Sequence, residues 1–356
     1  MFAGTAGAAK WDIVPTLSSD VTYTDNVRLA PAGSETSDWV TQVTPGISVS
    51  GTGAGLRVSA VYGAQFIDRA RSNSGGVSHQ FSGTGNAELV RQLLFVDASA
   101  SVGQQNISLL GPQTNNNINV TGNRTTVRTF LVSPYLRRSF GQSAQGELRL
   151  THSAVGTDSA GGLSTSRANR VNLQLSSGPA FKLYTWSVAY STENLDSAQQ
   201  PGVSSEKFTA GGRRLITSQV ALTSSVGYEK SDFATTGPAP NKTFWNAGFE
   251  WTPTPRTRLA ASVGKRYFGN SRTFDFSHRT RLTAWSAGYS EDVTTTHAQA
   301  LVPSSFATTS IIDPLFQSSI PDPVARQQAV RDFIALNALP PSLTVPLNVL
   351  TTQTIL

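Results

Sequence analysis

The sequence has no cysteine and a single methionine, and only 14% of its 356 residues are charged. Without cysteine there can be no disulfides or thiolate-bound metals, and such a chain is compatible with exposure to the periplasm. Hydrophobic residues make up 38%, whereas soluble domains usually carry about 45–50% apolar and about 25% charged residues. No apolar run reaches about 18 residues, so no transmembrane helix is predicted. A dense soluble core and a helical membrane protein are both disfavoured.

Glycine and aromatic residues are plentiful instead. The chain contains 30 Gly, 17 Phe, 8 Tyr and 6 Trp, and aromatic residues spaced along a sequence argue against disorder. The net charge is +6, but the basic residues are scattered, so nucleic acid is not an expected partner. This balance fits a barrel with an apolar outside and a wet interior.

Residues 244–269, FWNAGFEWTPTPRTRLAASVGKRYFG, show the local pattern most clearly. Trp245, Phe249 and Trp251 share one parity, and polar or small residues occupy the other. Successive side chains of a strand point to opposite faces, so the pattern predicts one apolar and one polar face. The prolines of TPTPR mark a turn, because proline cannot donate to a strand ladder. Alternation resumes at Leu259 and Val263, which completes a hairpin.

The same alternation recurs in roughly 15 strand-like runs plus a further one. Short connections at 51–55, 90–92, 141–145, 176–180 and 252–256 alternate with long ones near 25–37, 67–78, 105–125, 156–166, 194–205 and 231–241. Short turns at one end and long loops at the other are typical of outer-membrane barrels. We therefore predict an all-β fold, an antiparallel transmembrane β-barrel of about 16 strands in the outer membrane of a Gram-negative bacterium.

The strands are expected over residues 11–296, after a tail at 1–10 that looks like the remnant of an export signal. Residues 297–345 are predicted to form a long loop, and 346–356 the start of a further strand. Within the loop, Pro323 and Pro340 delimit a helix expected at 322–339. Its apolar stripe, Val330, Phe333 and Ile334, favours a helix that constricts the pore, or one docked outside or above the rim.

Two sets of side chains follow from these parities. Trp and Tyr settle at membrane–water boundaries, so an aromatic girdle is predicted from Tyr184, Trp186, Tyr190, Tyr228, Trp245, Trp251, Tyr267, Phe268, Trp285 and Tyr289. Charges avoid lipid, so the predicted pore-lining set is Arg57, Glu88, Glu147, Arg149, Glu250, Arg258, Arg266, Asp275, Arg279 and Arg281. Excess arginine would favour anions; alternatively, these charges only solvate or brace the wall.

Four stretches, YTDNVRL (23–29), VTPGISVSGTGAGLRVSAVY (43–62), WTPTPRTRLAASVGKRYFGNS (251–271) and FSHRTRLTAWSAGYSEDVTTT (276–296), resemble one known family. It is the outer-membrane barrel family associated with the PEP-CTERM/exosortase system. The resemblance implies an outer-membrane location and a link to exopolysaccharide production, and it carries over no functional residues. Similar chains continue with further strands, whereas TTQTIL ends this one without a terminal aromatic strand, which leaves closure of the barrel open.

The remaining residues point to no chemistry. The four histidines lack metal-ligand spacing, so neither metal nor cofactor is expected. His152 beside Ser153 and His278 beside Ser277 are poor dyads, because adjacent strand residues face opposite ways. We expect a channel rather than an enzyme, with membrane lipid, lipopolysaccharide, polysaccharide and periplasmic export proteins as partners. The alternatives are a non-conducting scaffold barrel that docks export machinery and a barrel hydrolase.

Overall fold

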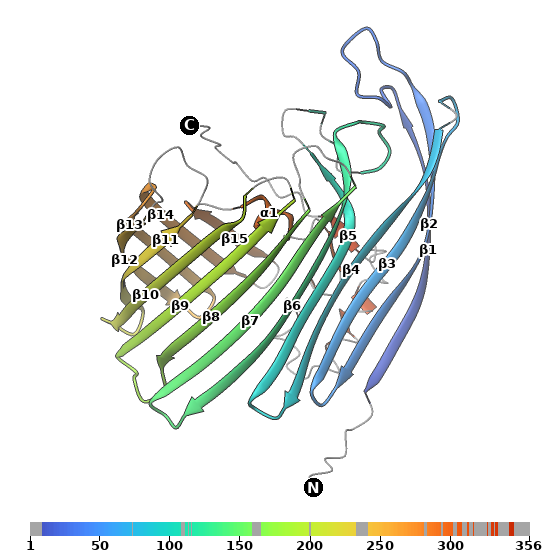
Figure 1. Cartoon of the computed structure of the whole chain (residues 1–356). Coiled ribbons are helices and arrows are strands. Elements are labelled where there is room, and N and C mark those ends of the chain that lie inside the picture. The colour runs from blue at the N-terminus through green and yellow to red at the C-terminus, as the bar shows by residue number, and fades with distance from the viewer. Residues whose placement is uncertain are drawn as a thin grey trace.

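Fifteen strands form one antiparallel sheet in chain order (Figure 1). This computed structural model describes residues 9–72, 74–107, 111, 112, 114, 116–158, 165–198, 201–232, 241–280, 283–292, 295–301, 305–307, 312, 316, 326, 329, 330, 332, 333 and 342–344. The strands are β1 (Lys10–Thr24), β2 (Asp38–Gly53), β3 (Leu56–Arg69), β4 (Ser74–Val90), β5 (Leu94–Asn106), β6 (Arg124–Phe140), β7 (Ala144–Thr157), β8 (Ser166–Ser177), β9 (Tyr184–Ser197), β10 (Val203–Leu215), β11 (Val220–Ser231), β12 (Asn241–Thr254), β13 (Thr257–Arg266), β14 (Gly269–Arg279) and β15 (Ala284–Ser290).

The remaining elements lie after the sheet. They are the short helix α1 (Thr296–Ala300) and a two-stranded sheet of β16 (Ser305–Ala307) and β17 (Ser342–Thr344). No helix among the described residues has the length and apolar character needed to cross a membrane.

The sheet is a meander that curls around a hollow (Figure 1). Each strand pairs with its neighbours in sequence, as the alternation predicts, so the all-β antiparallel prediction is confirmed. Within the part of the chain that is described, no ladder joins β1 to β15. Closure into a barrel of about 16 strands therefore stays a prediction, and the proposed strand at 346–356 lies outside the described residues, as does most of the tail at 1–10.

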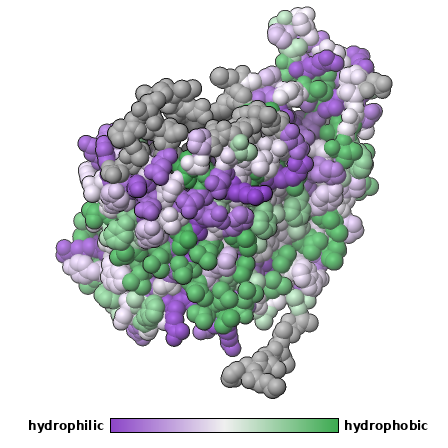
Figure 2. All heavy atoms as spheres, in the orientation of Figure 1, coloured by the Kyte–Doolittle hydropathy of each residue, from purple (hydrophilic) through white to green (hydrophobic). Residues whose placement is uncertain are grey.

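The two faces of the sheet differ in chemistry row by row. Leu148, Leu173 and Tyr190 are register partners across β7, β8 and β9. The next row on the same strands is Arg149, Asn172 and Ser191. The first face is convex, and its apolar residues gather in a band around the strands (Figure 2). We call it the outer face; the second, which α1 packs against, is the inner face.

Several strands are longer than the expected crossing of about 10 to 12 residues. Both β4 and β6 have 17 residues. Their apolar stretches cover only part of that length, so a pattern based on apolar alternation stops before the ladder does. As a result, the long connection expected at 67–78 shrinks to 70–73, between β3 and β4. At the opposite end the turns are tight, and Gly141 supplies the positive φ of 60° that one of them requires.

Candidate functional site

The inner face carries hydroxyls, amides and small residues, interrupted by clusters of charge. One cluster lies near the short turns of β5, β6 and β7. Arg149 Nη1 lies 2.7 Å from Asp97 Oδ2, and its Nε lies 3.0 Å from Glu147 Oε1. Arg137 Nη2 reaches the same Glu147 at 2.7 Å. The guanidinium of Arg149 also stacks 3.8 Å from the Tyr135 ring centroid. These contacts brace three strands from inside.

A second cluster occupies the same level on β10, β12 and β13. Arg213 Nε lies 3.2 Å from Glu250 Oε2, and Arg258 Nη2 lies 3.5 Å from Glu250 Oε1. Glu250 is therefore shared by two arginines on either side of its strand.

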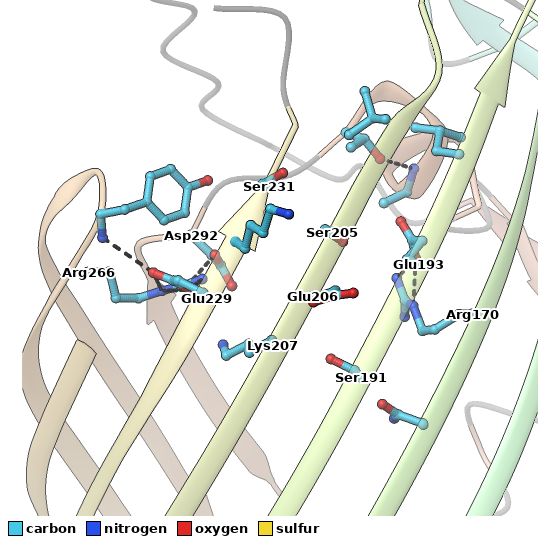
Figure 3. Close-up of a pocket in the computed structure, with 17 residues that line it drawn as sticks. Arg170, Ser191, Glu193, Ser205, Glu206, Lys207, Glu229, Ser231, Arg266 and Asp292 are labelled. Carbon is cyan, nitrogen blue, oxygen red and sulfur yellow. Dashed lines mark hydrogen bonds and ion pairs between the residues drawn. The ribbon is translucent and has the colours of Figure 1, made fainter. Parts of the chain in front are cut away.

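A third cluster lies near the opposite end, below α1. Arg266 donates to both oxygens of Glu229 at 2.7–3.2 Å and to Asp292 at 2.5 Å. The Glu229 side chain is only 6% exposed, which makes this the most enclosed ion pair of the described part. Arg170 Nε donates to Glu193 Oε2 at 2.6 Å. Together these groups ring a cavity on the inner face (Figure 3).

The predicted pore-lining residues lie on this inner face wherever the structure describes them. Glu147, Arg149, Glu250, Arg258 and Arg266 take part in the ion pairs above. The rest are placed there by register: Arg57 opposite Asn86, Glu88 opposite Phe95, Asp275 opposite Ala260 and Arg279 opposite Ala284. Arg281 lies outside the described residues. Sequence reasoning missed Asp97, Arg137, Arg213 and Glu229, although each has the inner parity.

The predicted girdle residues mostly lie exposed on the outer face. These are Tyr184, Tyr190, Tyr228, Trp245, Trp251, Trp285 and Tyr289. Trp186 shares their parity and packs edge-on against Phe181 at 6.4 Å. Tyr267 and Phe268 differ, since they form the turn after β13. Tyr267 lines the inner cavity, because strand alternation no longer applies beyond Arg266.

A segment after β15, residues 292–307, is anchored to strands on several sides of the hollow; we call it the mouth segment. Asp292 is held by Arg266 on β13. Both ring nitrogens of His297 on α1 form hydrogen bonds. Nε2 lies 2.8 Å from the hydroxyl of Ser153 on β7, and Nδ1 lies 2.7 Å from the hydroxyl of Ser166 on β8. Ala300 packs on Val127 and Val155. Farther on, β16 contacts β3 and β4. The mouth segment therefore spans from one part of the wall to another.

The helix expected at 322–339 is described only in part. Arg326, Val330 and Phe333 are helical, Val330 is buried, and Phe333 lies edge-on to Phe316 at 5.6 Å between centroids. Ile334 lies outside the described residues. The bounds of this helix and its role as a constriction stay predictions.

The connection between β5 and β6 also folds inward. Arg69 donates to the carbonyl oxygens of Ile118 at 3.0 Å and Asn117 at 2.8 Å. The amide of Asn117 donates to Ser78 at 3.1 Å, on the inner face of β4. Two connections that are distant in sequence are joined here, because Val120 N donates to Val27 O at 2.8 Å. The hollow is thus narrowed at this end from two sides.

No protein-family model matches the chain, and no curated protein matches it either. Among solved structures, the chain is similar to OmpT, an outer membrane protein of Vibrio cholerae, with 10% identity and a TM-score of 0.33 over 81% of this chain and 96% of that one. An anion-selective porin from Comamonas acidovorans gives 10% identity and a TM-score of 0.30, over 79% and 95%. OmpF of Salmonella typhi gives 10% and 0.31, over 72% and 89%. Scores this low leave function to be inferred from the side chains of the chain itself.

Proposed function

We propose that this chain is an outer-membrane β-barrel channel through which polar solutes cross passively. One observation carries the proposal: the two faces of the 15 strands have opposite chemistry, with the apolar one outside. In a soluble sheet, rows such as Leu148, Leu173 and Tyr190 would be buried in a core; here they are exposed. A band of exposed apolar residues around a whole sheet is typical of a surface that faces lipid.

The ends of the apolar band support the same proposal. Trp251 and Trp285 lie near the short turns, whereas Trp245 and Tyr289 lie toward the long connections. Rings that carry an apolar body and a polar tip suit the two boundaries of a bilayer. Membrane lipid and lipopolysaccharide are then the partners of the outer face.

The ion pairs of the inner-face arginines indicate that these residues hold neighbouring strands together rather than select ions by charge. Arg149 and Arg266 each contact two carboxylates, so most of their field is cancelled locally. We propose a weakly selective pore rather than one built for anions. A role in exopolysaccharide export, with periplasmic export proteins as partners, is the finer proposal, and the resemblance of residues 251–271 and 276–296 supports it.

The mouth segment favours a second candidate function, a scaffold barrel that does not conduct. A hydrolase is not proposed. His152 forms a hydrogen bond with Asn169 on the outer face, whereas the neighbouring Ser153 points to the inner face. The histidine that Ser153 does contact, His297, has Ser166 at its other nitrogen, where a hydrolase needs a carboxylate.

Conductance in planar bilayers tests the proposal. Protein folded into lipid should migrate faster on a gel unheated than boiled, as closed barrels do, and that fraction should produce discrete current steps. Folded barrels that carry no current would favour the scaffold function. Failure to fold into lipid, with good folding in water, would overturn both.

A further inference from the structure

A cavity lies on the inner face below α1, away from the ion-pair clusters near the short turns. Its volume is about 440 Å³, within the range of about 300–1,000 Å³ that is usual for small-molecule sites. Inward-facing residues of β8, β9, β10 and β11 form its floor, and Thr295 and Ala298 of the mouth segment contribute to its lining. Figure 3 shows Glu193, Lys207, Glu229 and Arg266 around it.

The inward-facing carboxylates of this cavity are already engaged. Both oxygens of Glu229 accept from Arg266, and Asp292 accepts from the same guanidinium. Glu193 accepts from Arg170. Each of these three carboxylates therefore has a positively charged donor, and the remaining carboxylate of the lining, Glu206, has the outer parity of β10.

Three donors of the lining, on Lys207, Ser231 and Tyr267, have no acceptor among the described residues. Lys207 Nζ has no carboxylate within 4.0 Å among the described residues, and it lies 5.0 Å from the centroid of the Phe244 ring. Phe244 in turn lies over Gly227, where a Cβ would come within 2.5 Å of the ring. The three N–H groups of the ammonium thus form no ion pair with the described residues and can donate to a ligand.

The hydroxyls of Ser231 and Tyr267 are two further donors without an acceptor among the described residues. Ser231 is 5% exposed, and its Oγ is buried without any hydrogen-bond partner. A buried polar group left unsatisfied destabilises the folded protein, and a ligand oxygen would satisfy this one. Tyr267 lines the same cavity, and its hydroxyl has no hydrogen bond to any described residue. Burial raises the pKa of Tyr267 to about 12, and Glu229 adds to the rise, so this hydroxyl keeps its proton and can donate.

Charge narrows the class of ligand. The cations Arg170, Lys207, Lys230 and Arg266 of the lining balance the carboxylates Glu193, Glu206, Glu229 and Asp292. A ligand with a net charge would leave the balanced cavity charged, whereas a neutral one would not. We propose that this cavity binds a neutral polyhydroxylated solute, such as a sugar unit, whose oxygens accept from Lys207, Ser231 and Tyr267.

This assignment rests on the proposed channel and names the class of solute that it recognises. The experiment measures block of the ion current through single channels in planar bilayers by a neutral hexose trisaccharide, in parallel with the monoanion glucuronate and with sulfate. We expect the trisaccharide to block the wild-type current, and Lys207→Met to weaken that block about tenfold, as loss of a charged donor does. Ser231→Ala should weaken it severalfold.

Lys182→Met is the matched control, because it removes the same charge from an exposed turn outside the cavity. It should leave the block unchanged. Open channels that no trisaccharide blocks, or equal block in Lys207→Met, would overturn the site and leave the channel standing. Lys207-dependent block by glucuronate or sulfate alone would show that the ligand class is wrong. Absence of current in folded wild-type barrels would instead overturn the proposed channel.

Discussion

The imidazole of His297 lies 2.8 Å from the hydroxyl of Ser153, although the two residues are 144 positions apart in the chain. Ser166 occupies the other ring nitrogen, so the buried histidine is held by hydroxyls on two adjacent strands. This contact fixes α1 against the inner face and, with Ala300, defines how far the mouth segment reaches into the hollow.

Acid should loosen this contact. Burial lowers the pKa of His297. The positive charge of Arg170 lowers this pKa further, whereas the negative charge of Glu193 raises it. Because the docked pKa lies below 6.5, docking is fully stable above pH 6.5 and weakens as the pH falls through the docked value. We therefore expect the single-channel current to increase as the pH is lowered from about 7.5 to about 5. His297→Asn should remove this step, whereas His152→Asn, on the outer face, should keep it. The same pH response in both variants would contradict the assignment.

The enclosed ion pair at Glu229 should contribute far more to stability than an exposed one. Glu229→Ala leaves the poorly solvated Arg266 with Asp292 as its one remaining carboxylate among the described residues, and breaking a buried pair costs about 3–5 kcal/mol. Asp158→Asn removes the partner of Arg128 at a site about half exposed, where a pair contributes about 1 kcal/mol or less. Urea unfolding in lipid vesicles should separate the two variants clearly. Equal losses would show that Glu229 is solvated.

Adjacent positions on β8 should respond in opposite ways to a charge. Leu173 is 51% exposed on the outer face, and Leu173→Arg should cost about 2–4 kcal/mol of folding free energy in a bilayer. Gln174→Arg places the same side chain on the inner face, opposite Glu147, and should be tolerated. The measurement is the folded fraction on unheated gels after insertion into vesicles. Equal tolerance would argue against lipid on the outer face.

The edge of β1 should pair with a strand from the C-terminal region. Unpaired backbone groups are not tolerated in the hydrocarbon layer, and within the described part of the chain β1 has a ladder on one side only. The chain has no cysteine, so single cysteines can be combined at Ser19 and at each of positions 346–356. One position, and not its neighbours, should form a disulfide with Ser19→Cys. Crosslinking at none of them would require another partner for β1.

The faces of the strands were predictable because alternation is a local property. Arg258 and Trp251 each need only their own parity to be assigned to a face, and the structure places them there. Ion-pair partners were not predictable, since Arg149 meets Asp97 across β6, 52 residues away. The face of Tyr267 was not predictable from parity, because the turn after Arg266 ends the alternation of side chains between the two faces. The docking of His297 depends on contacts that no short pattern contains.

The anchors of the mouth segment have a consequence for assembly. They lie on strands from β3 to β13, and the segment itself follows β15 in the chain. It can be seated only after those strands have already been synthesised and paired side by side. Docking of the mouth segment on the inner face therefore follows the pairing of the strands that it contacts.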